Sequence, residues 1–396
     1  MSRKNAKPLA SDSRLVADAL SRRQFIRSGT AVGAGGLIAT LGLSRYAAAQ
    51  GAPAAQSGAS ASGQSSTPPQ AGAPGQRPPP PPEPTVSQPP PLKDLKGKVA
   101  YVTAASDGIG LGIARAASNA GMKVVIGYRN EDRLKAALPL FKTGNAGVFA
   151  VKHDVTDRDG WKSMLDQVIR QYGKLHLVVN NAGIKTLRQA SQAKFDEWDN
   201  AVAVNFTAIY NSVAACLPHM MEHKEGGHFV TTASMGGLLP GVNAGVYTAT
   251  KIAAVGIMEA LRVELETTNV GTSVFCPGGV NTDNYFATGE ENPYRRPGAP
   301  QRPAGAPRPI FTSMDPLEAG ERVMNGIVNN DLFILSHPEF KPGMQERYDA
   351  IMDSTPKIET PINPERIANE VRVTRCGIYE REIAHRKIKR SSYRST

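Results

Sequence analysis

The sequence predicts an α/β fold in which helices cover both faces of one parallel sheet, a doubly wound arrangement. Short apolar runs rich in β-branched residues alternate with helical stretches between about residues 93 and 356. A glycine-rich turn follows the first apolar run, and a helical stretch with its own glycine stop follows that turn. Strands that alternate with helices pair in parallel through right-handed crossovers. Residues 93–356 are therefore expected to form one domain.

Residues 1–49 have the order of an export signal. The run SRRQFIR occupies 21–27, a weakly apolar and glycine-rich stretch follows over 28–43, and three alanines end the segment at 47–49. A basic region, a short apolar region and a small-residue cleavage site define a signal peptide, and this apolar region is too short for stable membrane insertion. The paired arginines resemble the twin-arginine signal, which implies export of a folded protein to the periplasm. A basic, disordered N-terminus without that function would leave the protein cytoplasmic.

The other flanking segments differ in composition from the domain. Residues 50–92 are almost entirely Ala, Gly, Pro, Gln and Ser, which predicts an extended, disordered linker. An insertion rich in Pro, Arg and Gly occupies 287–312 within the domain. Residues 357–396 form a basic C-terminal tail without a recognisable motif, and the two alternatives for it are an oligomer arm and a disordered segment.

The net charge of +11 does not indicate a nucleic-acid-binding domain. Residues 1–49 carry eight Lys or Arg against two acidic residues, residues 292–310 carry four Arg and no acid, and residues 376–396 carry six Lys or Arg against two Glu. The excess positive charge therefore lies in the leader, the insertion and the tail. No nucleic-acid partner is expected, although a tail that binds polyanions stays open.

The first half of the domain has the pattern of a dinucleotide-binding unit. An apolar run over 98–103 meets the turn A-A-S-D-G-I-G at 104–110, and a helical stretch over 111–120 ends at Gly121. A strand, a glycine turn and a helix place backbone N–H groups and the positive helix end at a pyrophosphate, which makes the fold Rossmann-type. The turn resembles the T-G-x-x-x-G-x-G motif of the short-chain dehydrogenase/reductase family, with Ala104 in place of its first glycine and Gly108 and Gly110 retained.

Three later motifs extend this resemblance. Asp154-Val155 matches the family's Asp-Val pair, whose carboxylate accepts from the adenine amino group; N-N-A-G at 180–183 matches a strand-end element; and C-P-G-G-V-N-T at 276–282 resembles P-G-x-V-x-T, which cradles the nicotinamide carboxamide. The cofactor-binding residues that the resemblance implies are Thr103, Ser106, Gly108, Ile109, Gly110, Arg129, Asn130, Asp154, Val155, Asn181, Ala182, Gly183, Tyr247, Lys251, Pro277, Gly278, Val280 and Thr282.

The end of the second strand favours NADP(H) over NAD(H). Members of the family that prefer NAD carry an acidic residue there, which accepts hydrogen bonds from the ribose hydroxyls. This sequence has Tyr128 instead, followed by Arg129 and Asn130, so no carboxylate repels a 2′-phosphate and a guanidinium is present to hold one. Asp107 in the glycine turn argues mildly for NAD, because some NADP-dependent members have a basic residue at that position.

The second half of the domain carries the candidate catalytic residues. Tyr247 and Lys251 are four residues apart, on one face of a helix, and an ammonium beside a phenol favours the phenolate. Ser234, which follows the strand at 227–232, is placed to hold a substrate oxygen against Tyr247. Asn205 matches the fourth catalytic position of the family, which keeps a proton path to the lysine. These residues in this order predict a general acid/base site for an alcohol and ketone pair.

The resemblance implies an NAD(P)-dependent oxidoreductase that transfers a hydride between nicotinamide and a small carbonyl or secondary-alcohol substrate. It also implies a homodimer or homotetramer assembled through the helices that contain Asn205 and Tyr247. Two alternatives stay open. An epimerase or dehydratase of the family's extended branch is disfavoured, because the turn does not follow T-G-x-x-G-x-x-G. A non-catalytic NADP(H)-binding sensor or scaffold is disfavoured by the intact catalytic set.

Other kinds of site receive little support. The three Cys are an odd and widely spaced set, and C-x-x-C does not occur, so neither a disulfide framework nor a metal site is expected. Ser234 lacks the G-x-S-x-G surroundings of a hydrolase nucleophile. Residues 284–312 occupy the position of the family's substrate lid, where Arg295 and Arg296 would favour an anionic substrate; a solvated loop is the alternative.

Overall fold

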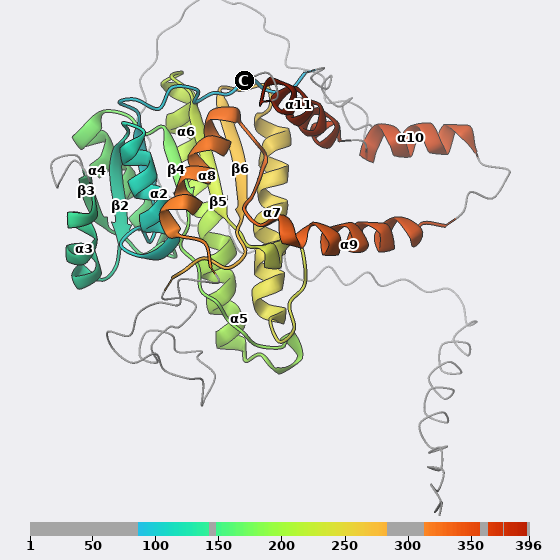
Figure 1. Ribbon diagram of the computed structural model, residues 1–396, viewed down its shortest axis with the longest axis horizontal. Helices are drawn as coiled ribbons and strands as arrows, with labels where there is room; N and C mark the ends of the chain where they lie inside the picture. Colours follow the sequence, from blue (N-terminus) through green and yellow to red (C-terminus); the bar gives the residue numbers. More distant parts are fainter. Residues whose placement is uncertain (1–85, 142–147, 283–312, 357–362, 375, 394–396) are drawn as a thin grey trace, which may run out of the picture. The chain divides into compact units, whose positions relative to one another are not determined.

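A seven-stranded parallel sheet confirms the predicted doubly wound, Rossmann-type fold. The computed structural model describes residues 86–141, 148–282, 313–356, 363–374 and 376–393; the leader, most of the expected linker and the 287–312 insertion lie outside them. In the described part the strand order is β3-β2-β1-β4-β5-β6-β7 (Figure 1). Every neighbouring pair is parallel, so each connection crosses over a face of the sheet.

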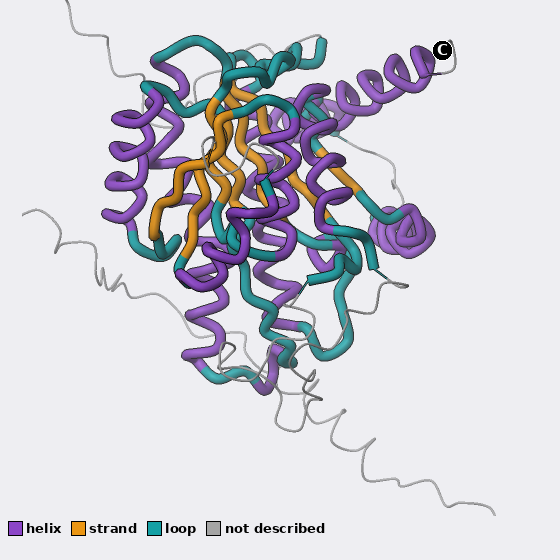
Figure 2. The backbone as a smooth tube through the Cα atoms, turned by 60° about the vertical axis from the view of Figure 1, so that its left-hand side comes forward, coloured by secondary structure: helices purple, strands orange, loops and turns teal. Residues whose placement is uncertain are grey.

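The helices form a layer on each face of the sheet (Figure 2). The strands are β1 (Val99–Val102), β2 (Lys123–Tyr128), β3 (Val148–Lys152), β4 (Leu177–Asn180), β5 (Gly227–Thr232), β6 (Val270–Cys276) and β7 (Phe333–Leu335). One core packs under α2 (Gly108–Asn119), α3 (Glu131–Ala137) and α8 (Pro316–Asn329), and the other under α4 (Arg158–Tyr172), α6 (Ala208–Glu222) and α7 (Gly245–Leu265). Further helices are α5 (Phe195–Val202), α9 (Lys341–Asp353), α10 (Pro364–Thr374) and α11 (Ile378–Tyr393).

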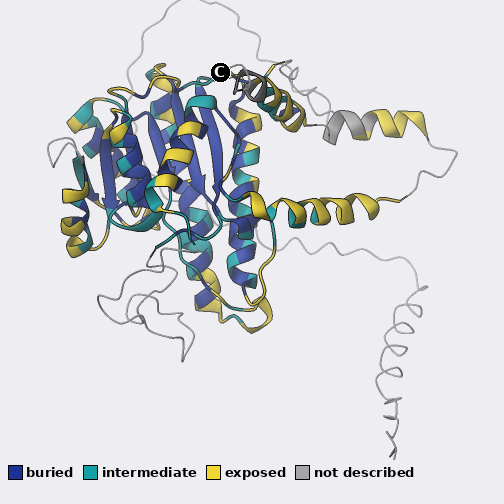
Figure 3. Cartoon of the chain, viewed as in Figure 1, coloured by how far each residue is buried: buried dark blue, intermediate teal, exposed yellow. Residues whose placement is uncertain are grey.

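The central strands are buried on both faces, as their continuous apolar runs predict (Figure 3). On the α2 and α8 side, the two helices touch backbone to backbone: a Cβ on Gly112 would collide with the Pro316 carbonyl, and one on Gly320 with the Gly112 carbonyl. This close contact holds α8 directly beside the helix that starts in the glycine turn.

The segment Phe195–Glu222 is one long helix in which α5 continues through a single π-helical turn, Ala203–Thr207, into α6. By length and composition it is the one helix in the described part that qualifies as a candidate membrane span. It nevertheless packs within the domain, and Asn205, Asn211 and Ser212 on it are buried against neighbouring elements. A core helix of the α/β domain accounts for its apolar character.

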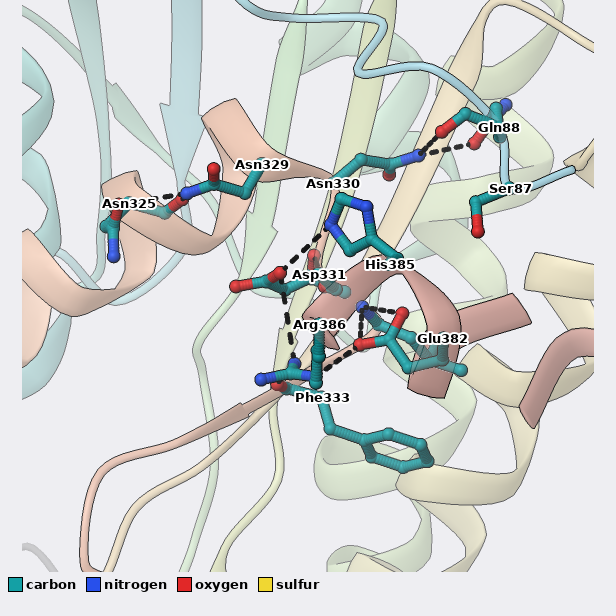
Figure 4. Close-up of polar contacts among 12 residues, drawn as sticks. Ser87, Gln88, Asn325, Asn329, Asn330, Asp331, Phe333, Glu382, His385 and Arg386 are labelled. Atoms are coloured by element: carbon teal, nitrogen blue, oxygen red, sulfur yellow. Dashed lines mark hydrogen bonds and ion pairs between the residues drawn. The ribbon is translucent and has the colours of Figure 1, made fainter. Parts of the chain in front are cut away.

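Two segments far apart in the sequence close the amino-terminal edge of the sheet, and we call this set of contacts the terminal clasp (Figure 4). Gln88 donates from Nε2 to the carbonyl oxygens of Leu265 (2.9 Å), Thr268 (2.9 Å) and Val270 (3.1 Å), and its own side-chain oxygen accepts from Asn330 Nδ2 at 2.9 Å. The linker expected at 50–92 therefore ends earlier, because Gln88 and later residues belong to the folded domain.

The second half of the terminal clasp is α11. Arg381 forms two hydrogen bonds, at 2.6 and 2.5 Å, to Glu266, the residue directly after α7, and both side chains are largely buried. Glu382 accepts from the backbone N–H of Leu332, and Arg386 donates to the Phe333 carbonyl on the edge strand β7. The tail expected as an arm or a disordered segment thus includes a helix that covers the sheet edge, because its charged face pairs with this domain.

Candidate active site

The predicted site residues gather at the carboxyl-terminal edge of the sheet. The glycine turn follows β1, Arg129 follows β2, Asp154 follows β3, Ser234 follows β5 and Pro277 follows β6. The chain reverses direction across the sheet between β1 and β4, since β2 and β3 lie on one side of β1 and β4 to β7 on the other. Ligands of doubly wound sheets bind at such a switch point, so the fold itself selects this location.

The glycine turn has the backbone geometry of a close-approach site. Gly108 has φ +55°, and a Cβ on Gly110 would collide with the Ala104 carbonyl and the Asn181 side chain, so neither position accepts a larger residue easily. Ala104, which replaces the first glycine of the motif, also has φ +50° and is thus held in the left-handed region. Asp107 caps α2 by accepting from the Gly108 N–H at 2.7 Å.

Thr103 and Asn181 brace this turn. The Thr103 hydroxyl accepts from the N–H groups of Asn181 and Ala182, both at 2.8 Å, and donates to Val179. The Asn181 side chain donates to the Thr103 carbonyl at 3.2 Å. The buried Thr103 hydroxyl is fully used by backbone groups and shapes the turn, and contact of Thr103 with the cofactor stays a prediction.

Two arginines lie at the position expected for the adenosine end of a dinucleotide. Arg129, whose side chain is 71% exposed, pairs with Asp154 at 3.3 Å. Arg133, which sequence reasoning missed because it lies inside α3, pairs with Asp107 at 3.5 Å. Asn130 uses its side-chain oxygen to cap α3, accepting from the Arg133 N–H at 2.9 Å. Asn130 therefore fixes where α3 begins, and with it the position of Arg133 in the first turn of that helix.

Asp154 is held in its ionised form. Burial alone would raise the pKa of Asp154, but hydrogen bonds from the Thr156 N–H and hydroxyl and the charge of Arg129 outweigh burial, and the pKa is lowered. The next residue, Val155, is buried and accepts from the Trp161 indole at 2.9 Å. The Asp-Val pair is thus fixed on both sides, with its carboxylate as an acceptor at the strand end.

Tyr247, Lys251 and Ser234 come together beside the carboxyl ends of β5 and β6. The Lys251 Nζ lies 5.7 Å from the Tyr247 ring centroid and donates to the Thr232 carbonyl at 2.9 Å. The Ser234 hydroxyl and the Tyr247 ring are neighbours, since a Cβ on Gly236 would lie 3.5 Å from the hydroxyl oxygen and 3.2 Å from the ring, and the hydroxyl accepts from the Gly236 N–H at 3.0 Å. A phenol and a hydroxyl in mutual contact, with a buried ammonium one helical turn away, form an acid/base site.

The pKa of the phenol differs from the sequence-based expectation. Burial raises the pKa of Tyr247, the Ser234 hydrogen bond lowers it in part, and Lys251 does not counteract the burial. Lys251 is itself buried, which lowers its pKa to about 8. The expected lowering of the Tyr247 pKa by the ammonium was therefore wrong for the protein alone, because burial of the phenol outweighs the other influences on it.

Asn205 is fully engaged with the backbone of the loop after β4. Its side-chain oxygen accepts from the Ile184 N–H at 2.8 Å, and its amide donates to the Ile184 carbonyl at 2.9 Å and the Thr250 hydroxyl at 3.1 Å. A Cβ placed on Gly183 would lie 3.3 Å from both the Asn205 oxygen and the Lys251 Nζ. Asn205 thus lies close to Lys251, while its hydrogen bonds to Ile184 hold the loop.

The element after β6 is anchored at several points. The Pro277 carbonyl accepts from the Met235 N–H at 2.9 Å, and the Gly278 N–H donates to Nδ1 of His337 at 3.0 Å. Val280 is buried and pairs with Met314 in an isolated bridge. The methyl group of Thr282 lies against Gly108, so this element contacts the glycine turn. No local pattern marked His337, which follows the last strand.

The remaining predicted residues are Ser106 and Ile109, and neither side chain makes a hydrogen bond within the described part of the chain. Ser106 is half-buried in the glycine turn, and Ile109 packs on the core under α2. The described residues hold no cluster of His, Cys, Asp or Glu that fits a metal ion. Burial raises the pKa of the Cys216 and Cys276 thiols to about 12, so both are unreactive packing residues.

The comparisons with known proteins agree with this geometry. A sequence profile of the family described as short chain dehydrogenase matches residues 98–292. An uncharacterized oxidoreductase of Listeria innocua is 35% identical over 191 residues, which are 48% of this chain and 77% of that protein. A C alpha-dehydrogenase of Sphingobium is 26% identical over 275 residues, covering 68% of this chain and 90% of that protein.

Solved structures show the same relationship. The structure of a short-chain dehydrogenase/reductase from Burkholderia phymatum in complex with NAD has a TM-score of 0.59 at 26% identity, covering 68% of this chain and 99% of that one. A short-chain dehydrogenase from Novosphingobium aromaticivorans has a TM-score of 0.58 at 29% identity, covering 77% and 98%. The described chain belongs to the short-chain dehydrogenase family and is an NAD(P)-dependent oxidoreductase.

Proposed function

We propose that this enzyme catalyses reversible hydride transfer between NADP(H) and a carbonyl or secondary-alcohol substrate, with Tyr247 as its acid/base. The observation that carries the proposal is the convergence of Tyr247, Ser234 and Lys251 beside the carboxyl ends of β5 and β6. The left-handed Gly108 and the crowded Gly110 fit the close approach of a dinucleotide to the start of α2. A bound nicotinamide supplies or accepts the hydride.

Each residue of the site has one role in this proposal. Tyr247 gives its proton to the carbonyl oxygen in reduction and removes it in oxidation. Ser234 donates a hydrogen bond to the same oxygen and orients it toward the phenol. Lys251 holds a buried ammonium 5.7 Å from the Tyr247 ring centroid, where it is placed to bind the nicotinamide ribose. Asn205 holds the backbone at Ile184, and thereby the neighbouring Gly183.

The preference for NADP(H) rests on Arg129 and Arg133. Both guanidinium groups lie where the ribose of the adenosine half is expected, and their present partners, Asp154 and Asp107, are carboxylates that a 2′-phosphate would compete with. The test is kcat/KM for NADPH and NADH side by side. Arg129→Gln is expected to lower the value for NADPH about tenfold and leave that for NADH within twofold. Equal losses for both cofactors would contradict the preference.

The substrate class is tested by following cofactor absorbance with a panel of secondary alcohols, ketones and aldehydes. Turnover in both directions with at least one alcohol and ketone pair is expected, together with loss of that turnover in Tyr247→Phe. Binding of the dinucleotide without turnover of any pair would contradict the proposal and favour a binding protein. Release of a dehydration or epimerisation product would contradict it in favour of the extended branch.

Assembly and location are further parts of the proposal. Large apolar side chains are exposed along the helices that contain Asn205 and Tyr247, among them Tyr210 (58% exposed) and Val263 (51%), which supports a homodimer or homotetramer. Light scattering of the purified protein tests this. The twin-arginine pattern supports export to the periplasm, and cell fractionation of the wild type and of a double lysine substitution at Arg22 and Arg23 tests it.

A further inference from the structure

The loop at 184–190 follows β4 and contacts both the helix that carries Asn205 and the helix that carries Tyr247. At one end, both backbone groups of Ile184 are hydrogen-bonded to the Asn205 side chain. At the other end, the carbonyl of Arg188 accepts from the N–H of Val246, the residue directly before Tyr247, at 3.3 Å. The loop therefore contacts both helices through backbone hydrogen bonds.

The start of α7 depends on this loop because it has little capping of its own. Its N-cap residue is Ala244, which has no side chain that can accept from the first free N–H groups. Gly245 lies so close to the loop that a Cβ there would collide with the backbone of Ala190. Gln189 adds a hydrogen bond to the Asn243 side chain at 2.6 Å. The loop thus supports the first turn of the catalytic helix.

One partly buried ion pair fixes the loop. Arg188 donates from Nε to both oxygens of Glu197, at 3.1 and 3.2 Å, and from Nη2 to one of them at 2.7 Å; Glu197 is only 3% exposed, whereas the Arg188 side chain is 33% exposed. Glu197 also accepts from the Lys194 N–H at 3.0 Å, which satisfies the N–H of the N-cap residue at the start of α5. The same carboxylate therefore anchors the loop and the helix that leads to Asn205.

We propose that Arg188 and Glu197 are positioning residues that set the orientation of the first turn of α7, and with it Tyr247, through the loop at 184–190. Their chemistry does not touch the substrate. They affect the reaction because the N–H of Val246, the neighbour of Tyr247, is hydrogen-bonded to the Arg188 carbonyl. A small displacement of an acid/base group lowers the rate strongly. This inference rests on the proposed role of Tyr247 in turnover.

The experiment compares Glu197→Gln, Arg188→Met and the double variant. Each single substitution is expected to lower kcat about tenfold while the KM for the dinucleotide stays within twofold, because the glycine turn lies on other elements. The double variant is expected to lose no more than the worse single one, since the two residues act as one unit. Arg188→Lys, which keeps the charge but only one bond, is expected to give an intermediate kcat.

Hydrogen exchange supplies a readout that does not need turnover. Faster exchange at residues 244–248 is expected in Glu197→Gln and Arg188→Met, and wild-type exchange in the control Arg322→Met, which breaks an exposed pair with Glu318 on α8. Wild-type kcat in Glu197→Gln, or a lower kcat with unchanged exchange at 244–248, would overturn the inference. A wild-type protein without turnover would overturn the proposed function instead, and the exchange result would still decide whether the pair seats α7.

Discussion

The two edges of the sheet use their polar residues in different ways. At the carboxyl edge, Ser234 and Tyr247 lie side by side, and Lys251 is the ammonium of the group. At the amino edge, the terminal clasp pairs charged side chains across long sequence separations, as Arg381 does with Glu266 (Figure 4 shows its neighbours). The difference indicates that substitutions at the first edge should change the rate and those at the second should change stability.

The largest effect is expected at the carboxyl edge. Tyr247→Phe removes the proton that the site transfers, and kcat is expected to fall at least about a thousandfold, or roughly 4 kcal/mol in the barrier. The buried ring remains, so the melting temperature and dinucleotide affinity should stay at their wild-type values. Steady-state kinetics, calorimetry and dinucleotide titration check the three quantities. A large loss of stability in this variant would remove the contrast between the edges.

The next largest effect is expected in the terminal clasp. Arg381→Met leaves Glu266 as a buried carboxylate without its bidentate partner, which should cost about 3 kcal/mol in the free energy of unfolding. The kcat at 25 °C should be unchanged, because the clasp is at the opposite end of the strands. Urea unfolding and kinetics on the same preparation check this. The exposed pair Arg322–Glu318 is the matched control, and Arg322→Met should cost less than about 1 kcal/mol.

A smaller effect is expected from two buried histidines near the amino edge. Burial lowers the pKa of His176 to about 4 and that of His228 to about 3, well below the ordinary value of 6.5. Below about pH 6.5 the unfolded chain therefore binds protons at these two histidines, whereas the folded protein does not. Their contribution to the free energy of unfolding is fully present above about pH 6.5 and is lost as the pH falls toward these lower values. The melting temperature should drop by a few degrees between pH 7 and pH 5.5.

A matched variant separates the contribution of His176. His176 Nδ1 accepts from the Val99 N–H at 3.2 Å, and His176→Asn keeps an acceptor near that position without a titrating ring. The fall of the melting temperature with acidification should be shallower in this variant. An identical pH dependence in variant and wild type would show that His176 does not titrate as its burial indicates.

The smallest effect concerns backbone strain in the glycine turn at the carboxyl edge. Ala104 has φ +50°, a conformation that costs a non-glycine residue about 1 kcal/mol. Ala104→Gly should therefore stabilise the protein by up to about 1 kcal/mol, reduced by the entropy that glycine adds to the unfolded chain. Urea unfolding measures the gain. A destabilised variant would show that the Ala104 methyl group makes a contact worth more than the strain.

Local patterns were sufficient to predict the central fold and most of the site. The predicted strand at 227–232 coincides with β5, and the helix expected to contain Tyr247 is α7. Glycine turns and strand ends are determined by neighbouring residues, which is why Gly108 and Asp154 were found. Those motifs converge because parallel strands bring their carboxyl ends to one edge.

Long-range pairing was not predictable in the same way. Gln88 lies in a Pro-rich sequence, and its partners are between 177 and 242 residues away, so no local pattern marks it. The charged face of α11 resembles a solvated tail until its partners on α7 and β7 are known. The raised pKa of Tyr247 also depended on tertiary structure, because its main cause is the burial of the phenol in the folded domain.

The position of Gln88 has a practical consequence for handling the protein. Gln88 is fixed to the Val270 carbonyl at the beginning of β6, whereas Pro277 follows the end of that strand. Seven residues of strand separate the two points, a distance of about 20 Å. An affinity handle or surface attachment introduced just before residue 86 would join the domain beside the amino ends of the strands. Immobilisation through that point is therefore expected to leave the carboxyl edge open to small molecules in solution.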